Sequence, residues 1–172
     1  MQIMRMLKHL AYPDWWVGRR FPDAVMNRIE AAVTASETSH LAEIRFAVEA
    51  SLPASQLWRG ITARQRALAV FGELGVWDTA ANNGVLVYLL LADRDVEIVA
   101  DRGFNGKVEA AEWTAICTAM EQHFAVGEFE AGVLLGIERI QAVAQQHFPA
   151  SDADASNPAR NPNELPNRPV RI

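Results

Sequence analysis

Residues 77–103 read WDTAANNGVLVYLLLADRDVEIVADRG, and this stretch decides the fold. The uninterrupted apolar run over residues 85–91 predicts a central strand that is covered on both faces. The chain turns at Asp93–Asp95 and continues as an alternating strand that ends at Asp101. Because the two strands of a hairpin run antiparallel, the start of the first lies beside the end of the second.

A helix, a strand and a second helix are expected before this hairpin. Pro22 suits the first turn of a helix, and apolar residues recur at helical spacing over residues 22–38. Residues 43–50 alternate between apolar and polar side chains, which predicts a half-buried strand. Thr62 and Gln65 form a capping box that begins the second helix.

Two further helices are marked by apolar residues at helical spacing over residues 113–124 and 129–144. The expected order is therefore helix, strand, helix, strand, strand, helix, helix. A strand–helix–strand crossover makes the first two strands parallel, and the hairpin makes the third antiparallel. The sequence thus predicts an α/β fold with a small mixed β-sheet flanked by helices.

The composition is that of one ordinary globular domain. The chain has 172 residues, half of them apolar, and its net charge of −5 disfavours nucleic acid as a partner. Its single cysteine, Cys117, excludes an intramolecular disulfide and lies on an apolar helical face, where we expect a buried thiol. No apolar run has the length of a membrane span, and no signal-peptide pattern is seen at the N-terminus. The expected location is cytoplasmic or peripheral to a membrane.

Composition divides the chain into three parts. Residues 1–20 form a basic N-terminal arm with an excess of Lys and Arg side chains and with Trp15 and Trp16, which is compatible with binding to a membrane surface or a partner. We favour the alternative, a short helix whose tryptophans pack on the domain. Residues 21–149 form the domain, and residues 150–172, rich in Pro, Asn and Asp, are expected to be a disordered tail.

The predicted topology gathers oxygen-bearing side chains at one edge of the sheet. His40 and Glu43 stand where the first strand begins, residues 78–83 where the second begins, and Asp101 where the third ends. Hard cations such as calcium and magnesium take several oxygen ligands from carboxylates, amides and carbonyls. The alternative is ordinary turn chemistry, with Asp78 and Asp101 as capping residues.

The segment VWDTAANNGVLVYLLLADRDVEIVADRG resembles the core of the TPM domain family, also labelled TPM phosphatase. The resemblance continues in ETSHLAEIRFAVE upstream and in EWTAICTAMEQHF, GEFEAGVLLGI and HFP downstream, so that it covers residues 20–149. It implies an α/β/α sandwich around a mixed sheet. The positions that match the shared elements are Asp78, Asn83 and Asp101, and the resemblance implies these three as metal ligands.

The known members of this family suggest cofactors and partners. They include plastid thylakoid-lumen proteins tied to photosystem repair and bacterial membrane-associated proteins. An acid phosphatase activity is proposed for some relatives, and divalent cation binding, often of calcium, for others. Bacterial relatives occur beside membrane proteins of the LemA family. The resemblance therefore implies a divalent cation, calcium in particular, and a LemA-family partner.

Three functions are consistent with these observations. The first is a divalent-cation-binding interaction module, accessory to membrane-protein assembly or maintenance. The second is a metal-dependent acid-type phosphatase in which Arg102 neutralises phosphate charge. The third is a peripheral membrane or LemA-partner protein that acts through residues 1–20. We favour the first, because the sequence shows no nucleophile–base pair.

Overall fold

The structure is a computed structural model that describes residues 2–151 and 163–172. Its elements follow in the order α1 (Gln2–Leu10), α2 (Trp15–Arg20), α3 (Asp23–Glu37), β1 (Glu43–Glu49), α4 (Ala54–Trp58), α5 (Ala63–Glu73), β2 (Gly84–Leu90), β3 (Asp95–Ala100), η1 (Arg102–Phe104), α6 (Ala110–Ala125), α7 (Phe129–His147) and β4 (Val170–Arg171). Each predicted helix and strand is present, and the capping box at Thr62 and Gln65 is formed at the start of α5.

The strands form one mixed sheet in the order β3-β2-β1-β4. Strands β1 and β2 are parallel, with Glu43 opposite Gly84, as the crossover rule predicts. Strands β2 and β3 form the expected antiparallel hairpin, with Val85 opposite Ala100. The sheet topology predicted for the first three strands is confirmed.

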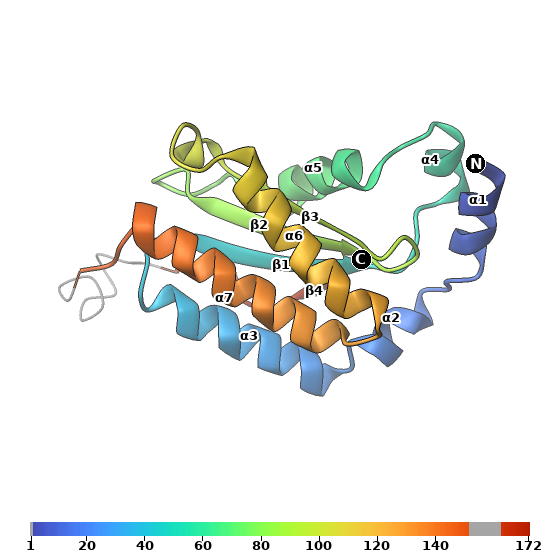
Figure 1. Ribbon diagram of the computed structural model, residues 1–172, viewed down its shortest axis with the longest axis horizontal. Helices are drawn as coiled ribbons and strands as arrows, with labels where there is room; N and C mark the ends of the chain where they lie inside the picture. Colours follow the sequence, from blue (N-terminus) through green and yellow to red (C-terminus); the bar gives the residue numbers. More distant parts are fainter. Residues whose placement is uncertain (1, 152–162) are drawn as a thin grey trace.

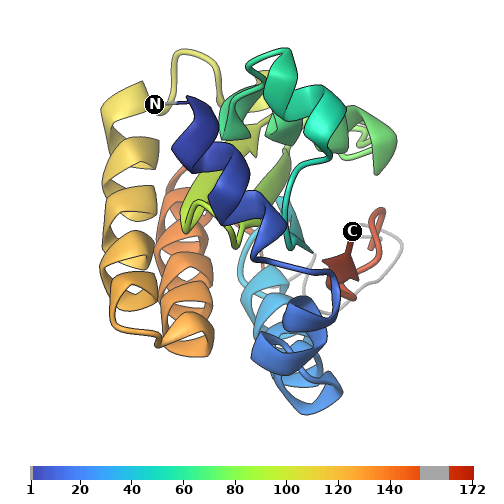
Figure 2. The ribbon, with the colours of Figure 1, turned by 90° about the vertical axis from the view of Figure 1, so that its right-hand side faces the viewer.

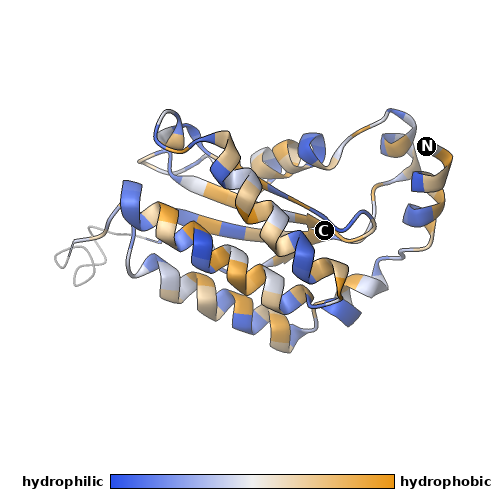
Figure 3. Cartoon of the chain, in the orientation of Figure 1, coloured by the Kyte–Doolittle hydropathy of each residue, from blue (hydrophilic) through white to orange (hydrophobic). Residues whose placement is uncertain are grey.

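Helices cover both faces of this sheet, which makes the fold an α/β/α sandwich (Figure 1). Helices α3, α6 and α7 pack on one face, against alternate residues of β1 and β2 such as Phe46 and Val87. Helices α4 and α5 pack on the other face, against Leu86 and Leu90. Figure 3 shows that α3, α6 and α7 carry both hydrophobic and hydrophilic residues, as expected of helices with one buried face.

Strand β1 is buried on both faces, so the prediction of a half-buried strand is wrong. All seven of its residues are buried, including the charged residues Glu43, Arg45 and Glu49. These three side chains have partners that the alternation pattern does not reveal. Arg45 donates to the backbone carbonyl of Pro166, which belongs to the C-terminal segment. A polar strand face is therefore compatible with burial here, because each charge is hydrogen-bonded.

The C-terminal residues 163–172 lie on the sheet, and for them the prediction of a disordered tail over 150–172 is wrong. Val170–Arg171 form β4, which pairs in parallel with β1, and Leu165 is only 6% exposed. The backbone N–H of Ile172 donates to the Val48 carbonyl at 2.9 Å. The remainder of the predicted tail, residues 152–162, lies outside the described residues.

Residues 2–20 contain two helices, α1 and α2, at one end of the molecule (Figures 1 and 2). Trp16 is half-buried and lies against Tyr12, with ring centroids 5.2 Å apart, and against the guanidinium of Arg20. Trp15 is 61% exposed, so the interpretation that both tryptophans pack on the domain does not hold for it. Within residues 2–151 and 163–172, none of the helices has both the length and the apolar composition of a transmembrane segment.

Candidate functional site

The predicted convergence of three strand ends is present at one edge of the sheet. The N–H of Asp101, which follows β3, donates to the Gly84 carbonyl at 2.9 Å. The N–H of Glu43, the first residue of β1, donates to the Asn83 carbonyl at 3.3 Å. The backbone therefore places Asn83, Glu43 and Asp101 side by side, and we refer to this region as the acidic edge.

A tight turn brings the chain into β2 at this edge. Asn82 has a positive φ of 52°, a conformation that asparagine tolerates better than most residues. The hydroxyl of Thr79, which is 7% exposed, accepts a 3.0 Å hydrogen bond from the N–H of Asn83. Thr79 was not predicted as part of the site. Its hydrogen bond to the backbone supports the turn.

Asn83 is buried, at 2% exposed, and only half of its amide is satisfied. Its Nδ2 donates to the carbonyl of Leu41. Its Oδ1 is fully buried and has no hydrogen-bond partner among the described residues. A buried polar atom without a partner costs about 1–3 kcal/mol, so this oxygen marks a position where a ligand would be stabilising.

Asp101 has one oxygen engaged and one free. Its Oδ1 accepts a 2.7 Å hydrogen bond from the N–H of Arg102 and thereby caps η1, which confirms the capping role considered from the sequence. Its Oδ2 is buried without a hydrogen-bond partner in the part of the chain that the structure describes. The Arg102 side chain does not neutralise this carboxylate, because its Nε donates instead to Oδ1 of Asn82 at 2.7 Å.

Asp78 lies on the outer side of the same turn. Its backbone N–H donates to the Gly75 carbonyl at 2.9 Å, and its side chain is exposed. Backbone hydrogen bonds bring Asn83 and Asp101 to the same sheet edge, whereas the Asp78 side chain lies in solvent. Among the described residues, no three His, Cys, Asp or Glu side chains converge as a metal-binding group. A cation at this edge would therefore need amide, backbone carbonyl or water oxygens besides its carboxylates.

Gly103 holds the two loops of the acidic edge in contact. A β-carbon at this position would lie 2.4 Å from the Asn82 carbonyl oxygen and 2.8 Å from that of Ala81. The Gly103 N–H donates to the Asn82 carbonyl at 2.8 Å. Only glycine permits this approach of backbone to backbone, so the relative position of Asn82 and Asp101 depends on it.

Two glutamates join this edge to the C-terminal segment. Glu43 is 4% exposed, its carboxylate accepts from the N–H of Leu165 at 3.2 Å, and burial raises its pKa. The Glu164 carboxylate accepts from the N–H of Ala80, on the turn before β2, at 3.1 Å and 3.2 Å. Glu164 was missed from the sequence because residues 150–172 were interpreted as a disordered tail.

Glu37 and His40 lie beside the acidic edge, where α3 ends. The Glu37 carboxylate accepts from the N–H of Ile44 at 2.9 Å, and burial raises its pKa to about 8. His40 is fully buried, and burial lowers its pKa to about 4. The His40 imidazole is therefore neutral at physiological pH.

The single cysteine has no nucleophilic character. Cys117 packs against the core formed by α3, α6 and α7, on the apolar face that the sequence predicts, but it is only partly buried. Burial raises the pKa of its thiol to about 11. The thiol is therefore protonated at neutral pH, when a nucleophilic cysteine has to be a thiolate.

The class of the domain is an α/β/α sandwich around a mixed sheet, and comparison with known families places the chain in one of them. The model of the TPM domain matches residues 20–143. The chain therefore belongs to the TPM domain family. The acidic edge lies within the matched region.

A solved structure with the same fold is similar over most of the chain. It is the NMR structure of the BA42 protein from the psychrophilic bacterium Bizionia argentinensis, with a TM-score of 0.73 and 27% sequence identity. The similarity covers 87% of this chain and 93% of the BA42 chain. None of the curated proteins matches the chain.

Proposed function

We propose that this protein is a divalent-cation-binding interaction module and that calcium binds at the acidic edge. The observation that carries the proposal is the pair of buried oxygens without hydrogen-bond partners among the described residues, Oδ1 of Asn83 and Oδ2 of Asp101. Both belong to segments joined by backbone hydrogen bonds at the same sheet edge. The resemblance to calcium-binding members of the TPM family points to the same cation.

The chemistry of the acidic edge suits a hard cation. An amide oxygen and a carboxylate are typical ligands of calcium and magnesium, and soft thiolate or thioether ligands are absent from the set Asp78, Asn83 and Asp101. Calcium takes 6–8 oxygens, so carbonyls and water would complete its shell. Asp78 would contribute as the exposed, outermost ligand. Calcium suits this set better than magnesium, which demands a near-ideal octahedron.

Titration calorimetry with calcium on the full chain tests the cation site. We expect heat of binding for the wild type and at least a tenfold weaker affinity for Asp101→Asn, which keeps a capping oxygen for η1 but removes the charge. The matched control is Asp95→Asn, at the other end of β3, which should bind as the wild type does. No binding heat in the wild type, or equal affinity in Asp101→Asn, would contradict the proposal.

The cation would act by ordering a surface for a partner. A cation between the turn at Asn83 and the start of η1 at Asp101 would fix the loops that Gly103 holds together. The assembly or maintenance of membrane proteins is the role we propose, with a LemA-family membrane protein as the partner. Affinity capture from cells with and without calcium tests this role: a LemA-family protein should be enriched only with calcium. Enrichment independent of calcium would contradict it.

A metal-dependent phosphatase is the second candidate, and Arg102 favours it. Its guanidinium is exposed and held by Asn82 beside the acidic edge, where it suits a phosphoryl oxygen. Hydrolysis of an aryl phosphate with added calcium or magnesium tests this function. The activity should disappear in the Asp78→Ala/Asp101→Ala double variant. Activity that persists in the double variant would come from a contaminant.

A further inference from the structure

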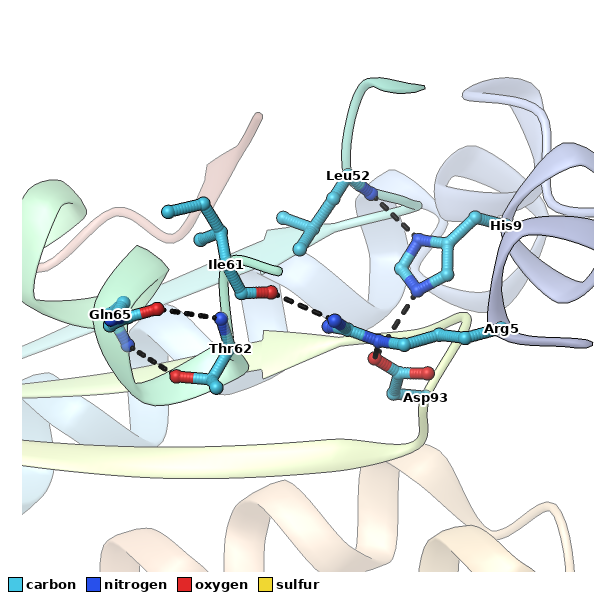
Figure 4. Close-up of polar contacts among 7 residues, drawn as sticks. All are labelled: Arg5, His9, Leu52, Ile61, Thr62, Gln65 and Asp93. Atoms are coloured by element: carbon cyan, nitrogen blue, oxygen red, sulfur yellow. Dashed lines mark hydrogen bonds and ion pairs between the residues drawn. The ribbon is translucent and has the colours of Figure 1, made fainter. Parts of the chain in front are cut away.

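Helix α1 is held against the domain by polar side chains of one face. Arg5 donates from Nε to Oδ2 of Asp93 at 2.9 Å and from Nη1 to the Ile61 carbonyl at 2.8 Å (Figure 4). His9, one turn later, lies with Nε2 at 3.2 Å from the same Asp93 oxygen, and its Nδ1 accepts from the Leu52 N–H at 2.9 Å. Since residues four apart share a helix face, these contacts fix the rotation of α1.

The tautomer of His9 follows from these contacts. Its Nδ1 accepts a hydrogen bond from Leu52, so the ring proton of the neutral imidazole is on Nε2 and is donated to Asp93. Burial lowers the pKa of His9, which is only 3% exposed. On the docked face of α1, the Arg5 guanidinium and both ring nitrogens of His9 therefore have hydrogen-bond partners.

The opposite face of α1 is apolar and open to solvent. Its exposed side chains form a stripe at helical spacing, which we call the apolar stripe: Ile3 (76% exposed), Met4 (70%), Leu7 (57%) and Leu10 (75%). A helix on the surface of a soluble domain normally buries its apolar face and exposes its polar face. Helix α1 does the reverse, so the apolar stripe is free to contact a further surface.

Basic and aromatic side chains accompany the apolar stripe. Lys8 is exposed on α1, and Trp15, Arg19 and Arg20 are exposed on α2, at the same end of the molecule (Figure 2). Residues 1–20 hold four Lys and Arg against one Asp in a chain whose net charge is −5. Local positive charge beside an apolar stripe and an exposed tryptophan complements the headgroups of an anionic lipid surface.

The apolar stripe is separate from the acidic edge and from the shared domain. The family model begins at residue 20, after α1. Asp93, which anchors α1, lies in the turn between β2 and β3, at the opposite edge of the sheet from Asp101. Binding through α1 therefore does not require the proposed cation site.

We propose that α1, oriented by its contacts with Asp93, inserts the apolar stripe into the headgroup region of a membrane that contains anionic lipid. The occupant is a lipid surface rather than a protein groove, because Lys8 is exposed on the same helix and the next helix, α2, exposes Trp15 and Arg19. The domain would then lie on the membrane with its acidic edge directed away from the inserted helix.

Co-sedimentation of the full chain with lipid vesicles, in buffer without calcium, tests this proposal. We expect binding to vesicles of phosphatidylcholine with phosphatidylglycerol, a blue shift of tryptophan fluorescence, and weaker binding to phosphatidylcholine alone or at high salt. Leu7→Ser should weaken binding roughly tenfold, because a leucine side chain no longer enters the interface. Lys8→Glu should weaken it on the anionic vesicles only.

The matched control is Leu68→Ser, which changes a leucine of α5 that is 51% exposed and is not part of the apolar stripe. It should bind vesicles as the wild type does, and circular dichroism should show all variants folded. Absence of wild-type binding, or equal binding of Leu7→Ser and wild type, would overturn the proposal. Self-association that Leu7→Ser abolishes, without vesicle binding, would assign the apolar stripe to a second copy of the chain and overturn it too.

Discussion

The Tyr88 hydroxyl donates a 2.6 Å hydrogen bond to the Glu49 carboxylate, although neither residue is more than 6% exposed. Arg66 donates to the same carboxylate oxygen from Nε at 2.9 Å. Burial beside Glu49 raises the pKa of Tyr88, so its hydroxyl stays protonated and donates. The Tyr88–Glu49 hydrogen bond joins the two central strands, and Arg66 joins them to α5. All three residues lie on the sheet face away from α3, α6 and α7.

Tyr88→Phe should destabilise the fold by about 2 kcal/mol, because a buried carboxylate loses a hydrogen bond. Urea unfolding measures the change. Tyr12→Phe is the control: Tyr12 is half-buried, and its hydroxyl has no hydrogen bond to the described residues, so the loss should stay within about 0.5 kcal/mol. Equal losses in the two variants would show that the Tyr88–Glu49 hydrogen bond contributes little.

Stability should pass through a broad maximum between pH 4.5 and 6.5 because of His40 and Glu37. The His40 pKa falls from 6.5 to about 4, so its contribution is complete above pH 6.5 and is lost as the pH falls towards 4. The loss amounts to about 3 kcal/mol. The Glu37 pKa rises from 4.5 to about 8, so its contribution is complete below pH 4.5 and is lost as the pH rises through 8.

Chemical unfolding across this pH range checks whether His40 and Glu37 cause these losses of stability. One variant tests the acid limb of the stability curve, below the maximum, and one tests the alkaline limb, above it. His40→Leu should flatten the acid limb, and Glu37→Gln should flatten the alkaline limb while keeping an acceptor for the Ile44 N–H. Each variant serves as the control for the other. If either variant leaves both limbs unchanged, the titrating group has been assigned wrongly.

Leu165→Ala should destabilise the protein by about 2–4 kcal/mol, because Leu165 is only 6% exposed and truncation of its side chain leaves a cavity. A disordered tail would predict no effect. Thermal unfolding distinguishes the two, with Leu68→Ala as the control, since Leu68 is 51% exposed and should lose less than about 0.5 kcal/mol. Identical melting temperatures for Leu165→Ala and wild type would argue against the docked C-terminal segment.

Gly103→Ala should disturb the acidic edge, because its β-carbon would meet the Asn82 carbonyl oxygen at 2.4 Å. We expect a loss of stability of about 1–3 kcal/mol and weaker calcium binding, measured by thermal unfolding and calorimetry. Gly72→Ala, in α5, meets no atom within 4 Å and should be neutral or stabilising by up to about 1 kcal/mol. Unchanged calcium affinity in Gly103→Ala would separate the loop contact from the proposed site.

The order of the central elements was predictable because their signals are local. The apolar run before Asp93 and the alternation after Asp95 locate the hairpin, and chain connectivity makes the first two strands parallel. Hairpin geometry alone brings Asp101 beside Gly84, so the acidic edge was also predictable. Thr79 was missed, since a hydroxyl that supports a turn is not distinguished by spacing.

The C-terminal strand was not predictable, because two residues have no period and their partner lies more than a hundred positions away. The only trace in the sequence is that Val170 and Ile172 are the only β-branched residues after Pro149. Burial of Glu43, Arg45 and Glu49 has the same origin. Their partners come from the C-terminal segment, α5 and β2, and alternation of polarity says nothing about distant partners.

The sequence by itself determined the hairpin of residues 77–103, its crossover to the preceding strand and the meeting of Asn83 and Asp101 at one sheet edge, because helical period, strand period and connectivity are local properties. Only the tertiary structure decided which oxygens at that edge lack partners and that Asp78 stays in solvent. It also decided that α1 turns its apolar side outward, because Asp93, Ile61 and Leu52 satisfy its polar side. These features depend on contacts between residues that are distant in the sequence and that come together only in the folded protein.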